Sequence, residues 1–177
     1  MKFRIPFVAL GLLALSCAPS YAQGLLQGDV IIPDGSPAKT YNADANGTAT
    51  VSGQSKHTLK FTNTTALPYN LVAGWTISLN LGGVQTSQKN DWGKAIPAGD
   101  TWSPPESPAS LSVHGDFSPG TYNVSATTEL FCADIGVQTN GNPTASRGFQ
   151  VVAKGTHGVA ILVEATLEKS LIGVVSD

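Results

Sequence analysis

The sequence contains little cysteine, little arginine and little charge. Its 177 residues include two cysteines, Cys17 and Cys132, and charged side chains make up 12% of the chain. Two arginines occur, Arg4 and Arg147, and no segment carries a cluster of cations. Because nucleic-acid binding depends on clustered Lys and Arg, we expect no nucleic-acid partner.

Long apolar runs are also scarce, and the first of them has the composition of an export signal. Lys2 and Arg4 precede the run "IPFVALGLLAL", which is too short to cross a bilayer. Ser20 and Ala22 are small residues of the kind found before a cleavage site. We therefore predict a signal peptide over residues 1–22 and no transmembrane segment in the rest of the chain.

A bacterial lipoprotein signal is the alternative for this leader. "LALSC" places Cys17 after an apolar run, but Leu15 is larger than the residue usual at that position. With either signal, we expect the protein to be secreted, periplasmic or at the cell surface.

Residues 23–177 are predicted to form one domain. Loss of Lys2 and Arg4 leaves eight Lys and Arg against twelve Asp and Glu, a net charge of −4. Cys132 is then the single cysteine, so no disulfide can form within the chain. An exported domain without disulfides must be stabilised by its hydrophobic core, which a chain of this length can supply.

The remaining sequence has the rhythm of β-structure. Apolar residues alternate with Thr, Ser and Asn, and Gly or Pro interrupts the chain about every ten residues. This pattern predicts an all-β, antiparallel sandwich, with a polar connection over 34–55 that could include one short strand and a loop over 136–146. We expect about eight strands, at residues 28–33, 57–62, 74–83, 84–92, 110–114, 122–130, 148–153 and 159–167.

Two strands carry the clearest patterns. "GWTISLNL" places Trp75, Ile77, Leu79 and Leu81 on one face. A Pro119-Gly120 turn precedes the second strand, whose inward face is expected to carry Tyr122, Val124, Ala126, Thr128 and Leu130. A Tyr directly after such a turn predicts a tyrosine corner, whose hydroxyl donates a hydrogen bond to the loop backbone. Cys132 continues this face, so we interpret it as a buried core thiol.

Together these segments resemble an immunoglobulin-like module of bacterial secreted and surface proteins. "LSVHGDFSPGTYNVSA" supplies the turn and the tyrosine, and "GWTISLNL" supplies a strand with an inward Trp. The similarity extends roughly from Lys56 to Leu130, and the cysteine pair of antibody domains is absent. The resemblance implies an immunoglobulin-like sandwich, and it assigns no activity because this fold carries many functions.

Trp92 and Trp102 are the candidate binding residues, because they flank "GKAIPAGDT", a segment that we expect to be a loop. Two exposed indole rings can form a flat platform for sugar rings. The polar residues that could bind the sugar hydroxyls there are Asn90, Asp91 and Asp100. The alternative is that each ring folds back and caps an end of the sandwich, since large aromatic side chains are usually mostly buried.

The sequence contains no catalytic or metal signature. Its histidines lack a second His or Cys at ligand spacing. "NADANG", residues 42–47, resembles part of a calcium loop, but Asp44 is its only carboxylate, so we interpret it as a polar turn. No nucleophile elbow, His-Glu-x-x-His pair or phosphate loop occurs. We therefore predict a protein that is not an enzyme and uses no metal or cofactor.

The expected function is that of a non-catalytic module in adhesion, assembly or ligand binding, with a protein or a polysaccharide as partner. A carbohydrate-binding module that uses the two tryptophans is one alternative. A pilus-type structural subunit is another, because "GLLQGDVII" could be donated to a neighbouring copy and strand edges can pair between chains. A homo-oligomer is therefore also possible.

Overall fold

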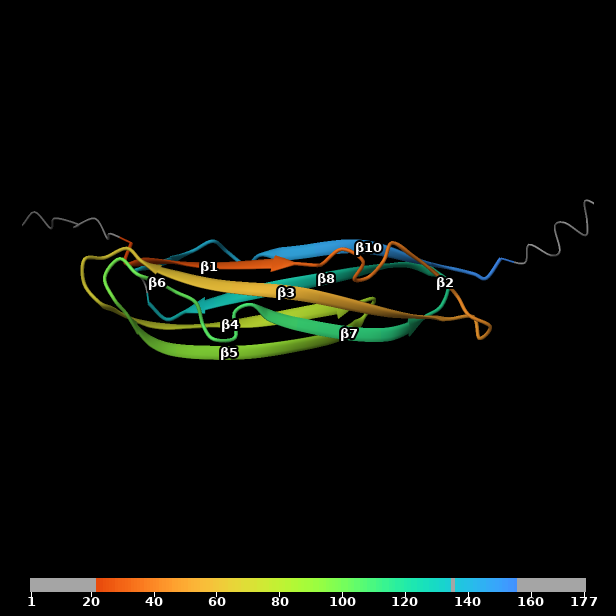
Figure 1. Cartoon of the computed structure of the whole chain (residues 1–177), viewed down its shortest axis with the longest axis horizontal. Helices are drawn as coiled ribbons and strands as arrows, with labels where there is room; N and C mark the ends of the chain where they lie inside the picture. Colours follow the sequence, from red (N-terminus) through yellow and green to blue (C-terminus); the bar gives the residue numbers. More distant parts are fainter. Residues whose placement is uncertain (1–21, 135, 156–177) are drawn as a thin grey trace, which may run out of the picture.

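The protein consists of two packed β-sheets (Figure 1), and along their strands buried side chains alternate with exposed ones. The computed structural model describes residues 22–134 and 136–155, which form ten strands and no helix. The strands are β1 (Gly24–Ile31), β2 (Thr40–Asn42), β3 (Ala49–Asn63), β4 (Tyr69–Leu81), β5 (Val84–Ile96), β6 (Thr101–Trp102), β7 (Ala109–Phe117), β8 (Gly120–Cys132), β9 (Val137–Thr139) and β10 (Thr144–Val152). The predicted all-β sandwich is confirmed. No helix in the described ranges could span a bilayer.

The first sheet, called sheet A, is built around β3. β1 pairs antiparallel with the C-terminal half of β3, and β9 adds a short parallel strand beyond β1. On the other side of β3, β7 pairs with its N-terminal half and β6 with Phe61 and Thr62. The loop between β6 and β7, residues 103–108, therefore lies beside the middle of β3.

The second sheet, called sheet B, has the order β2-β10-β8-β4-β5. Its pairings are antiparallel except for the parallel pairing of β10 with β2. The hairpin between β4 and β5 turns through Gly82 and Gly83, whose φ values of 56° and 103° are reached easily by glycine alone. Both sheets are thus mixed, not wholly antiparallel as predicted, because β2 and β9 are short parallel additions.

The inward faces of the two sheets meet in one hydrophobic core. The predicted inward residues of β4 are all at most 1% exposed: Trp75, Ile77, Leu79 and Leu81. On β8, Val124, Ala126 and Thr128 are buried, while Tyr122 and Leu130 are partly buried and pack against the core. Apolar alternation therefore assigned the faces of these strands correctly.

The prediction was wrong about the length of β3. Residues 34–55 were expected to be a polar connection with at most one short strand, but this segment contains β2 and the start of β3, which begins at Ala49 and has 15 residues. Its buried positions in β3 are Ala49, Val51, Gly53 and Ser55, and the small or polar Gly53 and Ser55 interrupt the apolar alternation that marks a half-buried strand.

The segment 136–146 also differs from the prediction. Residues 136–146 were expected to be a loop, but β9 lies within them and β10 begins at Thr144. Their inward-facing residues are few and partly exposed, which gives no periodic signal. The predicted strand at 159–167 and almost all of the predicted signal peptide lie outside the described residues.

The tyrosine corner is confirmed. The hydroxyl of Tyr122 donates a hydrogen bond of 2.9 Å to the backbone carbonyl of Ser118. Its ring stacks on Phe149, with ring centroids 5.4 Å apart, and meets Phe117 edge-on. The corner thus joins the β7–β8 turn to β10.

β1 is paired within its own chain. All eight of its residues pair with β3, from Gly24 opposite Asn63 to Ile31 opposite Lys56. The segment that a pilus-type subunit would donate to a neighbour is therefore already paired within the described fold.

Candidate functional site

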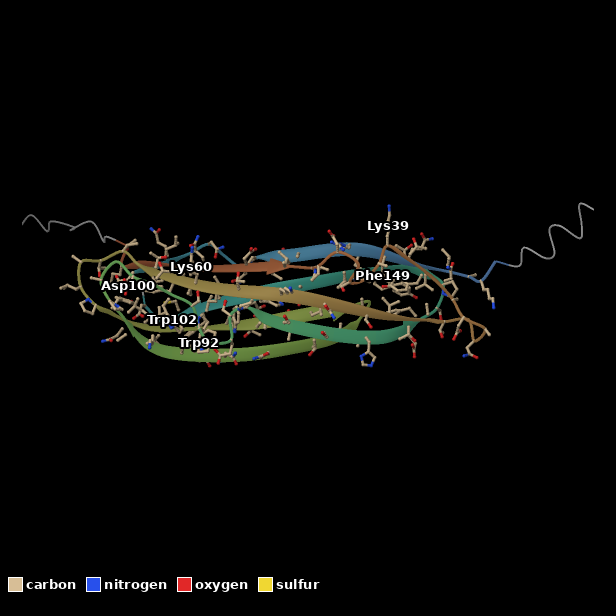
Figure 2. The ribbon with its side chains drawn as sticks, viewed as in Figure 1. Lys39, Lys60, Trp92, Asp100, Trp102 and Phe149 are labelled. Atoms are coloured by element: carbon tan, nitrogen blue, oxygen red, sulfur yellow. The ribbon has the colours of Figure 1, made fainter. Side chains whose placement is uncertain are left out.

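Trp92 and Trp102 both lie on strands, whereas Trp102 was predicted to be in a loop and Trp92 at the border of one. Trp92 is in β5 and Trp102 is in the two-residue strand β6. Glycine and proline around both residues indicated loops, but β5 continues through Gly93 to Ile96. Figure 2 shows both tryptophans toward the same end of the sandwich as Asp100.

The three tryptophans form an edge-to-face cluster. The rings of Trp75 and Trp92 are 5.7 Å apart at 66°, and those of Trp92 and Trp102 are 6.1 Å apart at 73°. Trp92 Nε1 donates a hydrogen bond of 3.0 Å to the carboxylate of Glu106. Trp92 and Trp102 are partly buried against the core and do not share one plane, so they present no common flat face. Ligand binding by this cluster stays a prediction.

The predicted polar partners of the tryptophans do not converge. Asn90 shares the inward side of β5 with Trp92, and its Nδ2 has no hydrogen-bond partner among the described residues. Asp91 is on the opposite side, where it pairs with Lys89 at 3.3 Å. Asp100 belongs to the turn after β5, and its backbone carbonyl accepts a hydrogen bond from the amide of Asn63. The structure therefore brings Asn90, but not Asp91, to the tryptophan side.

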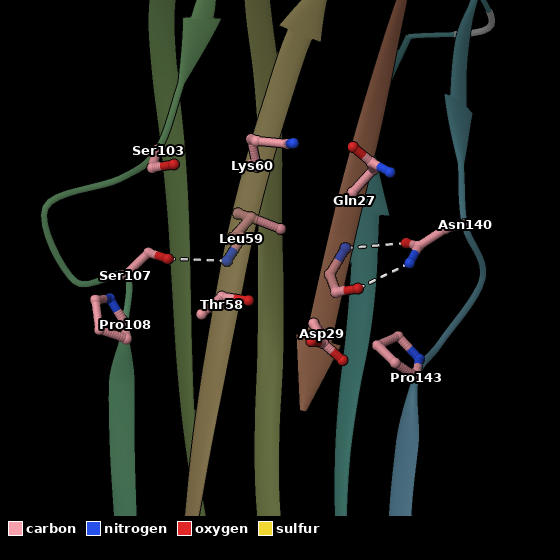
Figure 3. A pocket seen from close by; sticks show the side chains of 11 residues that line it. Gln27, Asp29, Thr58, Leu59, Lys60, Ser103, Ser107, Pro108, Asn140 and Pro143 are labelled. Carbon is pink, nitrogen blue, oxygen red and sulfur yellow. Dashed lines mark hydrogen bonds between the residues drawn. The ribbon is translucent and has the colours of Figure 1, made fainter. Parts of the chain in front are cut away.

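A groove on the outer face of sheet A is the better-formed candidate site (Figure 3). Its volume is about 620 Å³, within the usual range for small-ligand sites. Side chains on β1 and β3 that point away from the core form its floor: Gln27, Asp29, Thr58 and Lys60. Register places Gln27 opposite Lys60, and Asp29 opposite Thr58.

Two loops, each tied to a strand by a side chain, wall this groove. On one side, Ser107 Oγ accepts a hydrogen bond of 2.9 Å from the amide of Leu59. On the other, Asn140 binds both backbone groups of Gly28: its Oδ1 accepts at 2.9 Å and its Nδ2 donates at 2.8 Å (Figure 3). Pro108 and Pro143 add apolar surface to the two walls. These hydrogen bonds fix the width of the groove before any ligand enters.

The groove is polar but carries no net formal charge. Asp29 and Lys60 are its only ionisable side chains among the described residues that line it. Neither forms an ion pair within the described part of the chain. The floor therefore offers a carboxylate, an ammonium, an amide and a hydroxyl group to a ligand, a combination that suits a neutral molecule with many hydroxyl groups.

The polar turn at 42–47 behaves as the sequence predicts. Asp44 Oδ1 accepts hydrogen bonds from the amides of Asn46 and Thr48, at 2.8 and 3.2 Å. These backbone hydrogen bonds lower the pKa of the Asp44 carboxyl. In the described ranges, no three His, Cys, Asp or Glu side chains gather as metal ligands would.

His57 and Cys132 belong to the core and its margin. His57 is fully buried, with Ser55 Oγ and Thr128 Oγ1 each 2.8 Å from one of its ring nitrogens. Cys132 is partly buried and packs against the core, and burial raises the pKa of its thiol. Neither side chain lines the groove.

Comparisons with known proteins assign the chain to no family and find only remote structural similarity. No protein-family model and no curated protein matches the sequence. The chain is similar to the CARDB domain of a Pyrococcus furiosus protein, crystallised in complex with di-metal ions, at 11% identity and a TM-score of 0.29, over 76% of this chain and 98% of that one. The solution structure of that domain gives 10% identity and a TM-score of 0.28, over 73% of this chain and 95% of that one. A sporulation control protein from Bacillus subtilis gives 11% identity and a TM-score of 0.20, over 73% of this chain and 50% of that one. We infer no ligand, metal or function from similarity at this level.

The groove residues were not found by reasoning from the sequence. Asp29, Lys60, Ser107 and Asn140 are far apart in the chain and meet only through the order of strands in sheet A. The one local signal was the exposed polar set of β3, Lys56, Thr58 and Lys60, on the side opposite Leu59.

Proposed function

We propose that the protein is an exported, non-catalytic β-sandwich module that binds a hydroxyl-rich ligand, such as a segment of polysaccharide, in the groove of sheet A. The observation that carries the proposal is the pre-formed polar floor between two tethered loops. Such binding would act in adhesion to a glycan surface. The leader sequence supports export, since a basic start, an apolar run and small residues precede Gln23.

A binding role is favoured over catalysis by the content of the groove. Glycoside hydrolysis ordinarily needs two carboxyl groups that flank the scissile bond. Asp29 is the one carboxylate among the described residues that line the groove. The zero net charge of the lining also favours a neutral glycan over a polyanion or a polycation.

The tryptophan cluster is the second candidate surface for the same kind of ligand. Trp92 and Trp102 remain partly exposed, and Trp102 directly precedes Ser103 of the groove wall. A sugar ring would have to stack on one indole at a time, because the two rings are inclined at 73°. The two candidate surfaces can be separated by mutation.

Retention on insoluble polysaccharide tests the proposal. The full chain, purified after export from a bacterial host, is incubated with cellulose and chitin and printed on a glycan array. We expect Asp29→Ala with Lys60→Ala to weaken binding by about tenfold or more, because each removes a hydrogen bond to a charged group. Lys56→Ala is the matched control, since Lys56 is exposed on the same side of β3 outside the groove.

The outcomes distinguish the two surfaces. Loss of retention in the Asp29/Lys60 double variant, with normal retention in Lys56→Ala, supports the groove. Loss in a Trp92→Ala/Trp102→Ala variant alone would move the site to the tryptophan cluster. Absence of binding to every glycan tested, or turnover of any of them, would overturn the proposed function.

A further inference from the structure

β5 is a long sheet edge with one free side. Its 13 residues pair with β4 in unbroken register, and it ends the strand order of sheet B. Figure 1 shows it as the outer strand along one side of the sandwich. The other terminal strands in the described fold are shorter, with nine residues in β7, three each in β2 and β9, and two in β6. An exposed edge of this length offers a row of backbone N–H and C=O groups to another strand.

β5 lacks several of the protections that natural edge strands carry. Such edges are protected by proline, by bulges, by very short length or by charged side chains, and β5 has charged side chains at Lys89, Asp91 and Lys94. β5 contains no proline, and its register with β4 contains no bulge. Its first five residues, 84–88, carry no charge. Geometry therefore leaves this edge open to strand addition.

β5 carries three charged residues, Lys89, Asp91 and Lys94, and the first two are arranged symmetrically about Asn90. Lys89 and Asp91 flank it, both on the outer face of sheet B, with side chains 67% and 59% exposed. If a second copy pairs antiparallel about a two-fold axis at Asn90, Lys89 faces Asp91 of the second copy, and Asp91 faces its Lys89. The same register places Val84 opposite Ile96 at each end of the ladder. Opposite charges directly across a strand pair are stabilising, and two such pairs form by symmetry.

Neighbouring registers lack this complementarity. Moving the axis to Lys89 places two lysines opposite each other, and moving it to Asp91 does the same with two aspartates. Like charges directly opposite are destabilising. A pairing shifted by an odd number of residues would place the inward face of one copy beside the outward face of the other, which a two-fold symmetric pair excludes. Charge and face together therefore select the register centred on Asn90.

We propose that β5 is a self-association surface: two copies of the chain pair their β5 strands antiparallel about Asn90 and join two copies of sheet B into one continuous sheet. This surface goes beyond the proposed function, because the groove lies on sheet A and involves no residue of β5. Each copy uses its single β5 edge once, so the assembly closes as a dimer.

A charge swap tests this register. The full chain, purified after export, is examined by sedimentation equilibrium up to about 200 µM, a range suited to small interfaces. We expect a monomer–dimer equilibrium. Lys89→Asp and Asp91→Lys should each raise the dimer dissociation constant by about tenfold or more, because each converts two attractive pairs into repulsive ones. The double variant Lys89→Asp/Asp91→Lys should restore the wild-type constant.

Lys56→Asp is the matched control, since it makes the same charge change at an exposed position of β3. Thermal unfolding of each variant establishes that it is folded, and the exposed Lys89–Asp91 ion pair is expected to contribute little to stability. A monomer at every concentration would overturn the proposal. So would an oligomer larger than a dimer, an equal effect of Lys56→Asp, or a double variant no better than the single ones. Failure of glycan binding would leave this result unaffected.

Discussion

His57 of sheet A and Thr128 of sheet B share a hydrogen bond across the core, with 2.8 Å between Nδ1 and Oγ1. The other ring nitrogen is 2.8 Å from Ser55 Oγ, and all three side chains are fully buried. Burial lowers the pKa of His57 to about 4, because the charged imidazolium would lose its hydration. The ring is therefore neutral at neutral pH, with one nitrogen donating and the other accepting.

Stability should fall as the pH decreases from 6.5 to about 4. Between these pH values the unfolded chain binds a proton at His57 and the folded chain does not. The stabilisation that follows from this difference is therefore fully present above pH 6.5 and is lost as the pH falls through the folded pKa. We expect a loss of about 3 kcal/mol in the free energy of unfolding. Urea titrations across this range measure it. His57→Gln removes this titration and leaves the carboxylates, so the same pH dependence in that variant would contradict the assignment.

The tyrosine corner predicts a graded effect at one position. Tyr122→Phe removes only the hydrogen bond to Ser118 and should lower the free energy of unfolding by about 1 kcal/mol. Tyr122→Ala also removes the ring that stacks on Phe149 and should lower it by about 3 kcal/mol or more. Chemical denaturation measures both. Equal stability of wild type and Tyr122→Phe would mean that the hydroxyl bond contributes nothing.

Cys132 should react slowly with alkylating reagents in the folded protein. Its thiol is partly buried and its pKa is raised by that burial, so little thiolate is exposed at neutral pH. We expect iodoacetamide to modify it at least about tenfold more slowly than in urea. Mass spectrometry of the peptide that contains Cys132 measures the rate. Modification at the same rate in both conditions would identify an accessible thiol instead.

Apolar alternation was enough to predict part of the fold. It identified β4 and β8, since their inward positions carry Trp75, Ile77, Val124 and similar residues in strict period. It failed for residues 49–55 of β3, because Gly53 and Ser55 interrupt the apolar positions begun by Ala49 and Val51. Small and polar side chains can fill a core when the opposite sheet is close or supplies a hydrogen bond, as Thr128 does for His57. No pattern in the neighbouring sequence indicates such a hydrogen-bonding partner on the opposite sheet.

The candidate sites were harder to predict than the strands. Trp92 was predicted as a binding residue beside a loop, but its position on an edge strand depends on the pairing of β5 with β4. Asp29 and Lys60 have no sequence signature, because the groove exists only where two loops are tied to neighbouring strands. Side chains from four segments meet there through long-range pairing, which the periodicity of a single segment does not encode.

Asn63 should be among the most sensitive polar residues of the fold. It is 1% exposed at the end of β3, and its Nδ2 donates to three backbone carbonyls, those of Leu67, Ile96 and Pro97. Its Oδ1 accepts hydrogen bonds from the amide and the hydroxyl of Thr65. One side chain thus fixes the β3–β4 turn and the end of β5.

Replacing Asn63 by Leu keeps the size of the side chain and removes all of these hydrogen bonds. We expect the free energy of unfolding to fall by about 3 kcal/mol, because the buried carbonyls lose their donor. Asn123→Leu is the control at an exposed position and should change stability by no more than about 0.5 kcal/mol. Equal effects of the two substitutions in urea titrations would show that the buried amide does not hold the two sheets together at this end.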